Sequence, residues 1–151
     1  MDAERKTALV TGASRGIGQA IATMLAEQGT FVIGTATSEA GADAISTRLG
    51  PAGIGKVLDI TAADSIESLF KDIKDNYEAP LILVNNAGVT KDNLALRMKE
   101  QEWLQVIETN LNSVFRVTSA CLKAMTRARW GRIINISSVV GNMGNPGQSN
   151  Y

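Results

Sequence analysis

Short apolar runs alternate with amphipathic stretches along the whole chain. The runs are typical of buried strands, because apolar residues follow one another. Each run ends at or next to a small or polar residue (Gly, Ala, Asp, Asn or Ser). Five segments have this pattern: TALVTG (7–12), TFVIGTA (30–36), GKVLDI (55–60), LILVNN (81–86) and RIINISS (132–138).

The stretches between these runs carry apolar residues at helical spacing. One stripe is Ile17, Ala20, Ile21, Met24 and Leu25, and a second is Ile66, Leu69, Phe70 and Ile73. The longest consists of Trp103, Val106, Ile107, Leu111, Val114, Phe115, Cys121, Leu122 and Met125. Thr61 and Asp64 are expected to form a capping pair at the start of the second helix.

Strand and helix alternate up to a fifth strand, which predicts an α/β fold with a parallel sheet covered on both faces. We expect residues 1–151 to form one Rossmann-like, doubly wound domain with three αβα layers. The fifth strand is followed by a loop instead of a covering helix. The predicted domain is therefore incomplete at its C-terminal end, and we expect a longer protein that adds strands, helices and a substrate lid.

Composition limits the partners, the compartment and the acid–base chemistry that we expect for this protein. The 15 basic and 15 acidic residues balance, so no overall field favours nucleic acid or an anionic membrane as a partner. The apolar run near the N-terminus is too short for a signal peptide or a membrane span. A single cysteine, Cys121, excludes an internal disulfide and fits a reducing, cytoplasmic compartment. Histidine is absent, so another residue type must carry any acid–base chemistry, and we expect no metal site.

The segment TGASRGIG lies where the first strand turns into the first helix. Gly12, Gly16 and Gly18 allow a tight turn, and the helix N-terminus presents N–H groups and partial positive charge to a phosphate. No Gly-Lys-Ser/Thr follows, so the segment is not a nucleoside-triphosphate loop. Its place after the first strand favours dinucleotide binding over a purely structural turn.

The end of the second strand indicates which dinucleotide binds. A carboxylate there would accept hydrogen bonds from a ribose 2′-hydroxyl and repel a 2′-phosphate. This chain has the neutral Thr35, Thr37 and Ser38, and Glu39 comes later. Arg15 either pairs with a phosphate or is a solvated surface residue. Together these features favour NADP(H).

Five features follow one another along the chain: TGASRGIG, NNAG at 85–88, Asn110 in ETNL, Ser138 in ISSVVG and Tyr151 thirteen positions later. With these motifs the chain resembles the short-chain dehydrogenase/reductase family over essentially its whole length. Within the family it is most similar to members that reduce 3-oxoacyl thioesters on acyl-carrier protein with NADPH. The open alternatives are a ketoreductase for a polyketide, steroid or sugar carbonyl, and a non-catalytic NADP-binding module.

The resemblance implies Tyr151, Ser138 and Asn110 as catalytic residues, with Ser138 also binding the substrate carbonyl. A tyrosine has a reference pKa of about 10 and needs nearby positive charge to act as an acid at neutral pH. The family supplies this charge from a lysine four residues after the tyrosine, beyond the last residue here. From the residues alone, Ser137 is as good a candidate as Ser138, and Asn110 either holds a relay water or ties its helix to a neighbouring backbone.

The cofactor contacts implied by the motifs are Gly12, Ser14, Arg15, Gly16, Ile17, Gly18, Thr37, Asp59, Ile60, Asn86, Ala87 and Gly88. Asp59 either accepts a hydrogen bond from the adenine amine or caps the next helix. Cys121, Trp103 and Met125 are expected to pack in the core.

The implied partners are an acyl-carrier protein bearing a 3-oxoacyl thioester, and further copies of the full-length protein in a homotetramer assembled through the long helix and the helix that follows the tyrosine. The basic residues Lys123, Arg127, Arg129 and Arg132 either offset a helix dipole or dock the acidic carrier.

Overall fold

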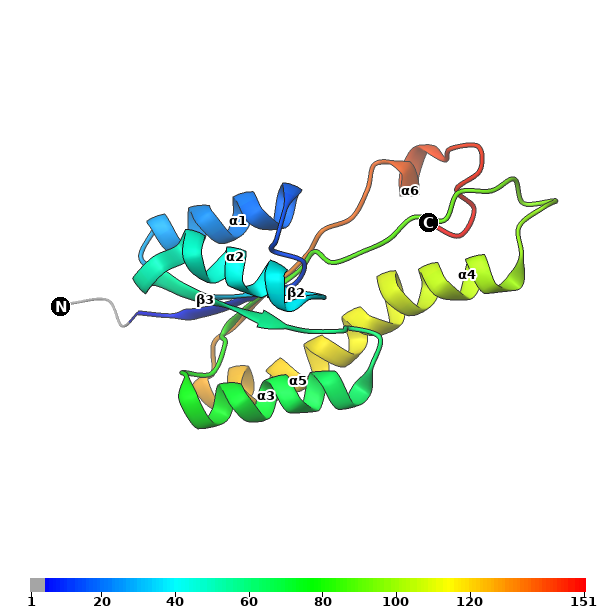
Figure 1. Cartoon of the computed structure of the whole chain (residues 1–151). Helices are drawn as coiled ribbons and strands as arrows, with labels where there is room; N and C mark the ends of the chain where they lie inside the picture. Colours follow the sequence, from blue (N-terminus) through cyan, green and yellow to red (C-terminus); the bar gives the residue numbers. More distant parts are fainter. Residues whose placement is uncertain (1–4) are drawn as a thin grey trace.

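A computed structural model describes residues 5–151 and contains one parallel sheet of five strands (Figure 1). The strands lie in the order β3-β2-β1-β4-β5. Their bounds are β1 Thr7–Val10, β2 Phe31–Ala36, β3 Gly53–Val57, β4 Ile82–Asn85 and β5 Arg132–Asn135. All four neighbouring pairs are parallel, so the carboxyl ends of the strands share one edge of the sheet.

Helices cover both faces of this sheet (Figure 1). The longer helices are α1 Gly16–Glu27, α2 Glu39–Leu49, α3 Ala63–Asn76, α4 Glu100–Ile107 and α5 Ser113–Ala128. A 3₁₀ turn (η1, Gly50–Ala52) follows α2, and the short α6 (Val140–Met143) follows β5. One buried cluster joins the sheet to α3 and α5, and a second joins it to α1 and α2. The predicted three-layer, doubly wound fold is confirmed.

The long helix predicted from the stripe between Trp103 and Met125 consists of α4, a π-helical turn (η2, Glu108–Asn112) and α5, which follow one another directly. Its buried side carries Val106, Val117, Cys121 and Met125. Trp103, which was expected to pack in the core, is 43% exposed, so that prediction is wrong. Leu111, Phe115 and Leu122 of the same stripe are 44 to 74% exposed. As Figure 1 shows, α4 extends past the sheet, so within residues 5–151 this part of the long helix does not pack on the sheet.

Cys121 is a core residue, as predicted. It is 1% exposed and packs in the cluster between the sheet and α5. Burial raises the pKa of its thiol to about 12, because the thiolate would lose its hydration. The side chain therefore stays a neutral apolar group at physiological pH.

The buried face of α1 differs from the predicted stripe. The helix buries Gly18 and Ala22, while Ile17 and Met24 are about 60% exposed. Small residues face the sheet because the first turn of α1 packs closely against the chain after β1: a Cβ on Gly18 would lie 2.2 Å from the Gly12 carbonyl oxygen. Close approach therefore overrides the apolar pattern here.

Two further details of the sequence analysis are wrong. The third strand begins and ends earlier than predicted, because Gly53 and Gly55 allow it to pair beside β2 and to pack against α2. Thr61 does not cap α3. The helix begins at Ala63, and the Thr61 hydroxyl instead donates to Asp59 Oδ1 at 2.6 Å.

The fifth apolar run was predicted to form a buried-type strand with no covering helix after it in this chain, and all four residues of β5 are exposed. Within residues 5–151 it is an edge strand that pairs only with β4. No helix in the same part of the chain is long and apolar enough to cross a membrane.

Leu9 and Leu96 form a matched pair for testing this core. Leu9 is fully buried in β1, and Leu96 is 98% exposed. We expect Leu9→Ala to lower the free energy of unfolding by about 2–5 kcal/mol through lost burial and a residual cavity. Leu96→Ala should change it by less than about 0.5 kcal/mol. Urea denaturation of both variants measures the difference, and similar midpoints would contradict the assigned core.

Candidate functional site

The strand order reverses between β1 and β4, and open α/β sheets bind ligands at the carboxyl ends of the strands beside such a point. A cavity of about 550 Å³ lies there. Every predicted cofactor contact except Gly18 lines it. Its lining consists of Gly12, Ser14, Arg15, Gly16, Ile17, Thr35, Ala36, Thr37, Leu58, Asp59, Ile60, Thr61, Asn86, Ala87, Gly88, Val89 and Thr109.

The turn between β1 and α1 forms one wall of the cavity. Gly12 has φ +66° and Gly16 has φ +56°, conformations that favour glycine. The Thr35 side chain accepts a long hydrogen bond from Gly12 N at 3.4 Å, and the Thr35 carbonyl accepts one from Ala13 N at 2.8 Å. The turn is thereby fixed against β2, and the N-terminus of α1 faces the cavity with the partial positive charge that an anion requires.

Asn86 locks this turn to the end of β4. Its amide nitrogen donates to the carbonyl oxygens of Thr11 and Gly12, both at 3.0 Å. The Thr11 hydroxyl accepts hydrogen bonds from the backbone N–H groups of Asn86 and Ala87, both at 3.1 Å. Gly18 lies beneath the same point, where a Cβ would be 2.4 Å from the Asn86 amide nitrogen. Gly18 therefore supports the turn from below and does not reach the cavity.

The end of β2 presents no carboxylate to the cavity. Thr37 and Arg15 both line it and are exposed. Ser38 instead caps α2, where its hydroxyl accepts a hydrogen bond from Gly41 N at 3.2 Å. Glu39 is the first residue of α2 and is not part of the lining. The end of β2 therefore contributes neutral groups, and Arg15 contributes a positive charge, to this part of the cavity.

Asp59 lies at the cavity after β3. Hydrogen bonds from the Thr61 hydroxyl and the Thr61 backbone N–H hold the pKa of the Asp59 carboxyl below its usual value. The carboxylate is therefore ionised at neutral pH. These bonds form a local turn before α3, so Asp59 organises the entry to the helix without capping it.

Asn110 lies in the π-helical turn and binds the chain that follows β4. Its Oδ1 accepts from Val89 N, and its Nδ2 donates to the Val89 carbonyl oxygen, both at 2.8 Å. Gly88 lies directly against it, since a Cβ there would be 3.2 Å from Asn110 Oδ1. Asn110 was expected either to hold a relay water or to tie its helix to a neighbouring backbone, and the structure contains the second of these interactions.

Ser138 and Tyr151 lie on the segment after β5 and do not line the cavity. The Ser138 hydroxyl oxygen accepts from Val140 N at 3.2 Å, which leaves its hydrogen available for donation. Tyr151 is 43% exposed, and its backbone N–H donates to the Gln148 carbonyl oxygen at 3.1 Å. The predicted cofactor contacts, apart from Gly18, thus lie together around the cavity. Ser138 and Tyr151 lie on the segment after β5 and are not in direct contact with the cavity.

Thr11 and Thr109 also belong to the site, although they were not predicted from the sequence. Thr11 is 2% exposed and holds the Asn86 backbone, while Thr109 lines the cavity from the long helix. A threonine next to Gly12 at the end of a buried strand was the available signal for Thr11. Nothing in the pattern distinguished Thr109 from other polar helix residues.

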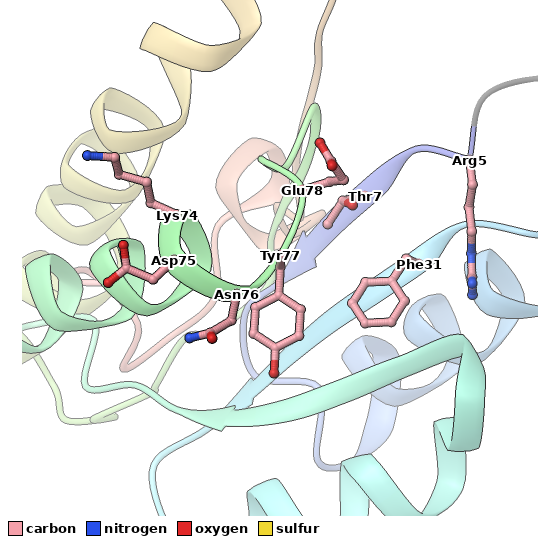
Figure 2. A pocket seen from close by; sticks show the side chains of 8 residues that line it. All are labelled: Arg5, Thr7, Phe31, Lys74, Asp75, Asn76, Tyr77 and Glu78. Atoms are coloured by element: carbon pink, nitrogen blue, oxygen red, sulfur yellow. The ribbon is translucent and has the colours of Figure 1, made fainter.

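A second hollow, of about 530 Å³, lies at the opposite edge of the sheet (Figure 2). It is formed by the starts of β1 and β2 and by the end of α3. Phe31 and Tyr77 stack there with ring centroids 5.9 Å apart, and the Arg5 guanidinium lies 5.2 Å from the Phe31 ring. These interactions link the amino ends of the strands to the end of α3, at the edge of the sheet opposite the predicted cofactor site.

Comparison with known proteins agrees with this geometry. Residues 6–151 match the model of the family described as short chain dehydrogenase. The chain is 60% identical over 151 residues to 3-oxoacyl-[acyl-carrier-protein] reductase FabG of Vibrio cholerae and 59% identical over 151 residues to that of Escherichia coli, covering all of the chain and 62% of each relative. It is 58% identical over 146 residues to FabG of Haemophilus influenzae, covering 97% of the chain and 60% of the relative.

The chain thus spans about three fifths of the length of these curated relatives. The family indicates a nicotinamide cofactor, and the cavity between the glycine turn and the end of β4 fits such a dinucleotide. The chain belongs to the short-chain dehydrogenase family.

Proposed function

We propose that the protein carrying this chain reduces 3-oxoacyl-[acyl-carrier-protein] to 3-hydroxyacyl-[acyl-carrier-protein] with NADPH, in fatty-acid biosynthesis. The observation that carries the proposal is the end of β2, which contributes Thr37 and no carboxylate to the cavity wall, with Arg15 in the same lining. The relatives named as 3-oxoacyl-[acyl-carrier-protein] reductases support the substrate class.

In this proposal the cavity residues hold the dinucleotide along its length. The N-terminus of α1, with Ser14, Gly16 and Ile17, faces the pyrophosphate, and Arg15 and Thr37 face the 2′-phosphate. Asp59 and Ile60 contact the adenine. The small Ala87 and Gly88 let the backbone approach the ribose and the nicotinamide.

Two hydroxyl groups complete the proposed chemistry. Bound NADPH supplies the hydride. Tyr151 donates a proton to the oxygen of the substrate carbonyl, and Ser138 donates a hydrogen bond to the same oxygen as negative charge develops on it. The bond that Ser138 accepts from Val140 N orients its hydroxyl without using its hydrogen.

The relatives do not favour the alternatives, a ketoreductase for another carbonyl and a non-catalytic NADP-binding module. We also propose a cytoplasmic homotetramer with no nucleic-acid or membrane partner. The exposed apolar side chains along the long helix support self-association, since Leu111 is 61% and Phe115 is 74% exposed.

Tyr151→Phe tests the proposed acid. In the complete protein, with NADPH and an acetoacetyl thioester, we expect kcat to fall by about 10²–10⁴-fold, because the phenolic proton is lost. The NADPH dissociation constant, measured by fluorescence, should not change. Tyr77→Phe is the matched control, since Tyr77 stacks on Phe31 at the other edge of the sheet. Equal turnover of both variants would exclude Tyr151 as the acid.

Arg15→Ala tests the proposed coenzyme preference. Loss of a charge-assisted hydrogen bond of about 1.5–3 kcal/mol should raise the KM for NADPH by roughly 10–100-fold and leave the KM for NADH nearly unchanged. Lys71→Ala removes one exposed positive charge from α3, outside the cavity, and serves as the control. Parallel changes with both coenzymes would show that Arg15 does not contact the 2′-phosphate.

The carrier protein is proposed to dock at the end of α5. Arg129 is exposed there in the left-handed conformation, with φ 51°, beside a hollow of about 600 Å³. Leu122, Met125 and Ile133 form the apolar part of this hollow. The Arg132 guanidinium lies 4.8 Å from the Trp130 ring, which keeps a second cation at the rim. Cations around an apolar floor complement an acidic protein.

Arg129→Glu tests this docking surface. We expect the KM for a carrier-bound 3-oxoacyl substrate to rise about tenfold or more, because a rim charge is reversed. The KM for a small soluble thioester should stay the same. Lys71→Glu, on exposed α3, controls for the change in net charge. An equal effect of Arg129→Glu on both substrates would reject docking.

A further inference from the structure

Asn150, the residue before Tyr151, is a buried polar residue. Its side chain is 5% exposed. Its amide nitrogen donates to the Lys91 carbonyl oxygen at 2.9 Å and to the Glu102 carbonyl oxygen at 3.2 Å. One amide therefore joins three parts of the chain: the segment that ends at Tyr151, the loop after β4 and the first turn of α4.

The same loop and segment meet at three further points. Gly147 accepts a hydrogen bond from Asn93 N at 2.8 Å, and Gln148 donates through its side chain to Asp92 Oδ1 at 3.1 Å. The Ser149 hydroxyl donates a weak hydrogen bond to the Met98 sulfur at 3.8 Å. Gln148 and Asp92 are at the surface, where competition with water weakens such a bond. Asn150 is buried, so its two hydrogen bonds are better protected from water than the bond between Gln148 and Asp92.

The loop is also attached to the cavity. Val89 lines the cavity and is held by two hydrogen bonds to Asn110. Two residues later, Lys91 binds Asn150. A short run of backbone therefore connects the nicotinamide end of the proposed site to the residue that precedes Tyr151.

Asn150 directly precedes Tyr151, so its two hydrogen bonds to Lys91 and Glu102 fix the backbone from which the phenol extends.

We propose that Asn150 is a positioning residue that sets the place of the Tyr151 phenol relative to the cavity by clamping its segment to Lys91 and Glu102. The inference rests on the proposed function, because it assigns the phenol a reacting partner. Misplacement of a reacting group by about 1 Å can cost 10²-fold in rate. Asn150 acts through Tyr151 and does not itself touch the substrate.

Asn150→Asp in the complete protein tests the clamp. The substitution keeps the shape of the side chain, removes both donors and sets a carboxylate against two carbonyl oxygens. We expect kcat to fall about 10–100-fold, with an unchanged dissociation constant for NADPH. Amide hydrogen exchange of segments 89–93 and 147–151 should become at least several-fold faster. Asn150→Ala, which adds no charge, should give the same pattern and replaces the aspartate variant if that variant does not fold.

Ser46→Ala is the control for general destabilisation. The Ser46 hydroxyl also joins two backbone positions, since it donates to the Ala42 carbonyl oxygen at 3.1 Å and accepts from Gly55 N at 2.8 Å, but it lies between α2 and β3. We expect this variant to lower Tm and to leave kcat unchanged.

Unchanged exchange in the Asn150 variants would overturn the clamp. Faster exchange with the kcat of the Ser46 control would leave Asn150 a merely structural residue and would overturn positioning. If the unmodified protein binds NADPH but reduces no 3-oxoacyl thioester, the proposed function fails, and the exchange measurement still decides whether the clamp exists.

Discussion

The site depends on one amide, that of Asn86, which bonds the carbonyl oxygens of Thr11 and Gly12. These carbonyls belong to the turn where the chain leaves β1 for α1, so the Asn86 amide holds this turn against the end of β4. The Thr11 hydroxyl links the same two segments in the opposite direction, because it accepts hydrogen bonds from the backbone N–H groups of Asn86 and Ala87. Because β1 and β4 are neighbours at the point where the strand order reverses, this exchange builds the ligand crevice directly into the sheet.

The same interaction explains the unusual packing of α1. The space for a close approach exists only without a Cβ at Gly18, where such an atom would meet both the Gly12 carbonyl and the Asn86 amide. A larger side chain would separate the helix from the turn and move its N-terminus away from the anion. The helix therefore buries the small Gly18 and Ala22 and leaves the larger Ile17 and Met24 exposed. Helix α1 buries less apolar surface as a result, but its N-terminus stays close to the turn.

The sequence predicted the order of the elements and the membership of the cavity well, because both follow from local signals: apolar runs, glycines at a strand end and polar residues after strands. It failed where the outcome depends on what lies beside an element. The pattern cannot reveal that Phe115 faces outward, since an apolar stripe looks the same in a core and on an open helix face. Asn150 was missed for a related reason, because its partners are 48 and 59 positions away in the chain.

The two halves of the proposed site are built by different means. The cofactor half is made of backbone at the ends of the strands, where β-sheet hydrogen bonds and tight packing fix each group. The proton-donating half lies on a largely exposed segment after β5, attached to the remainder by side-chain amides and a few backbone bonds. The loop from Val89 to Asn93 touches both halves, since Asn110 holds one end and the segment before Tyr151 holds the other. Coenzyme affinity and turnover should therefore respond to different residues, and changes in this loop are the ones expected to alter both.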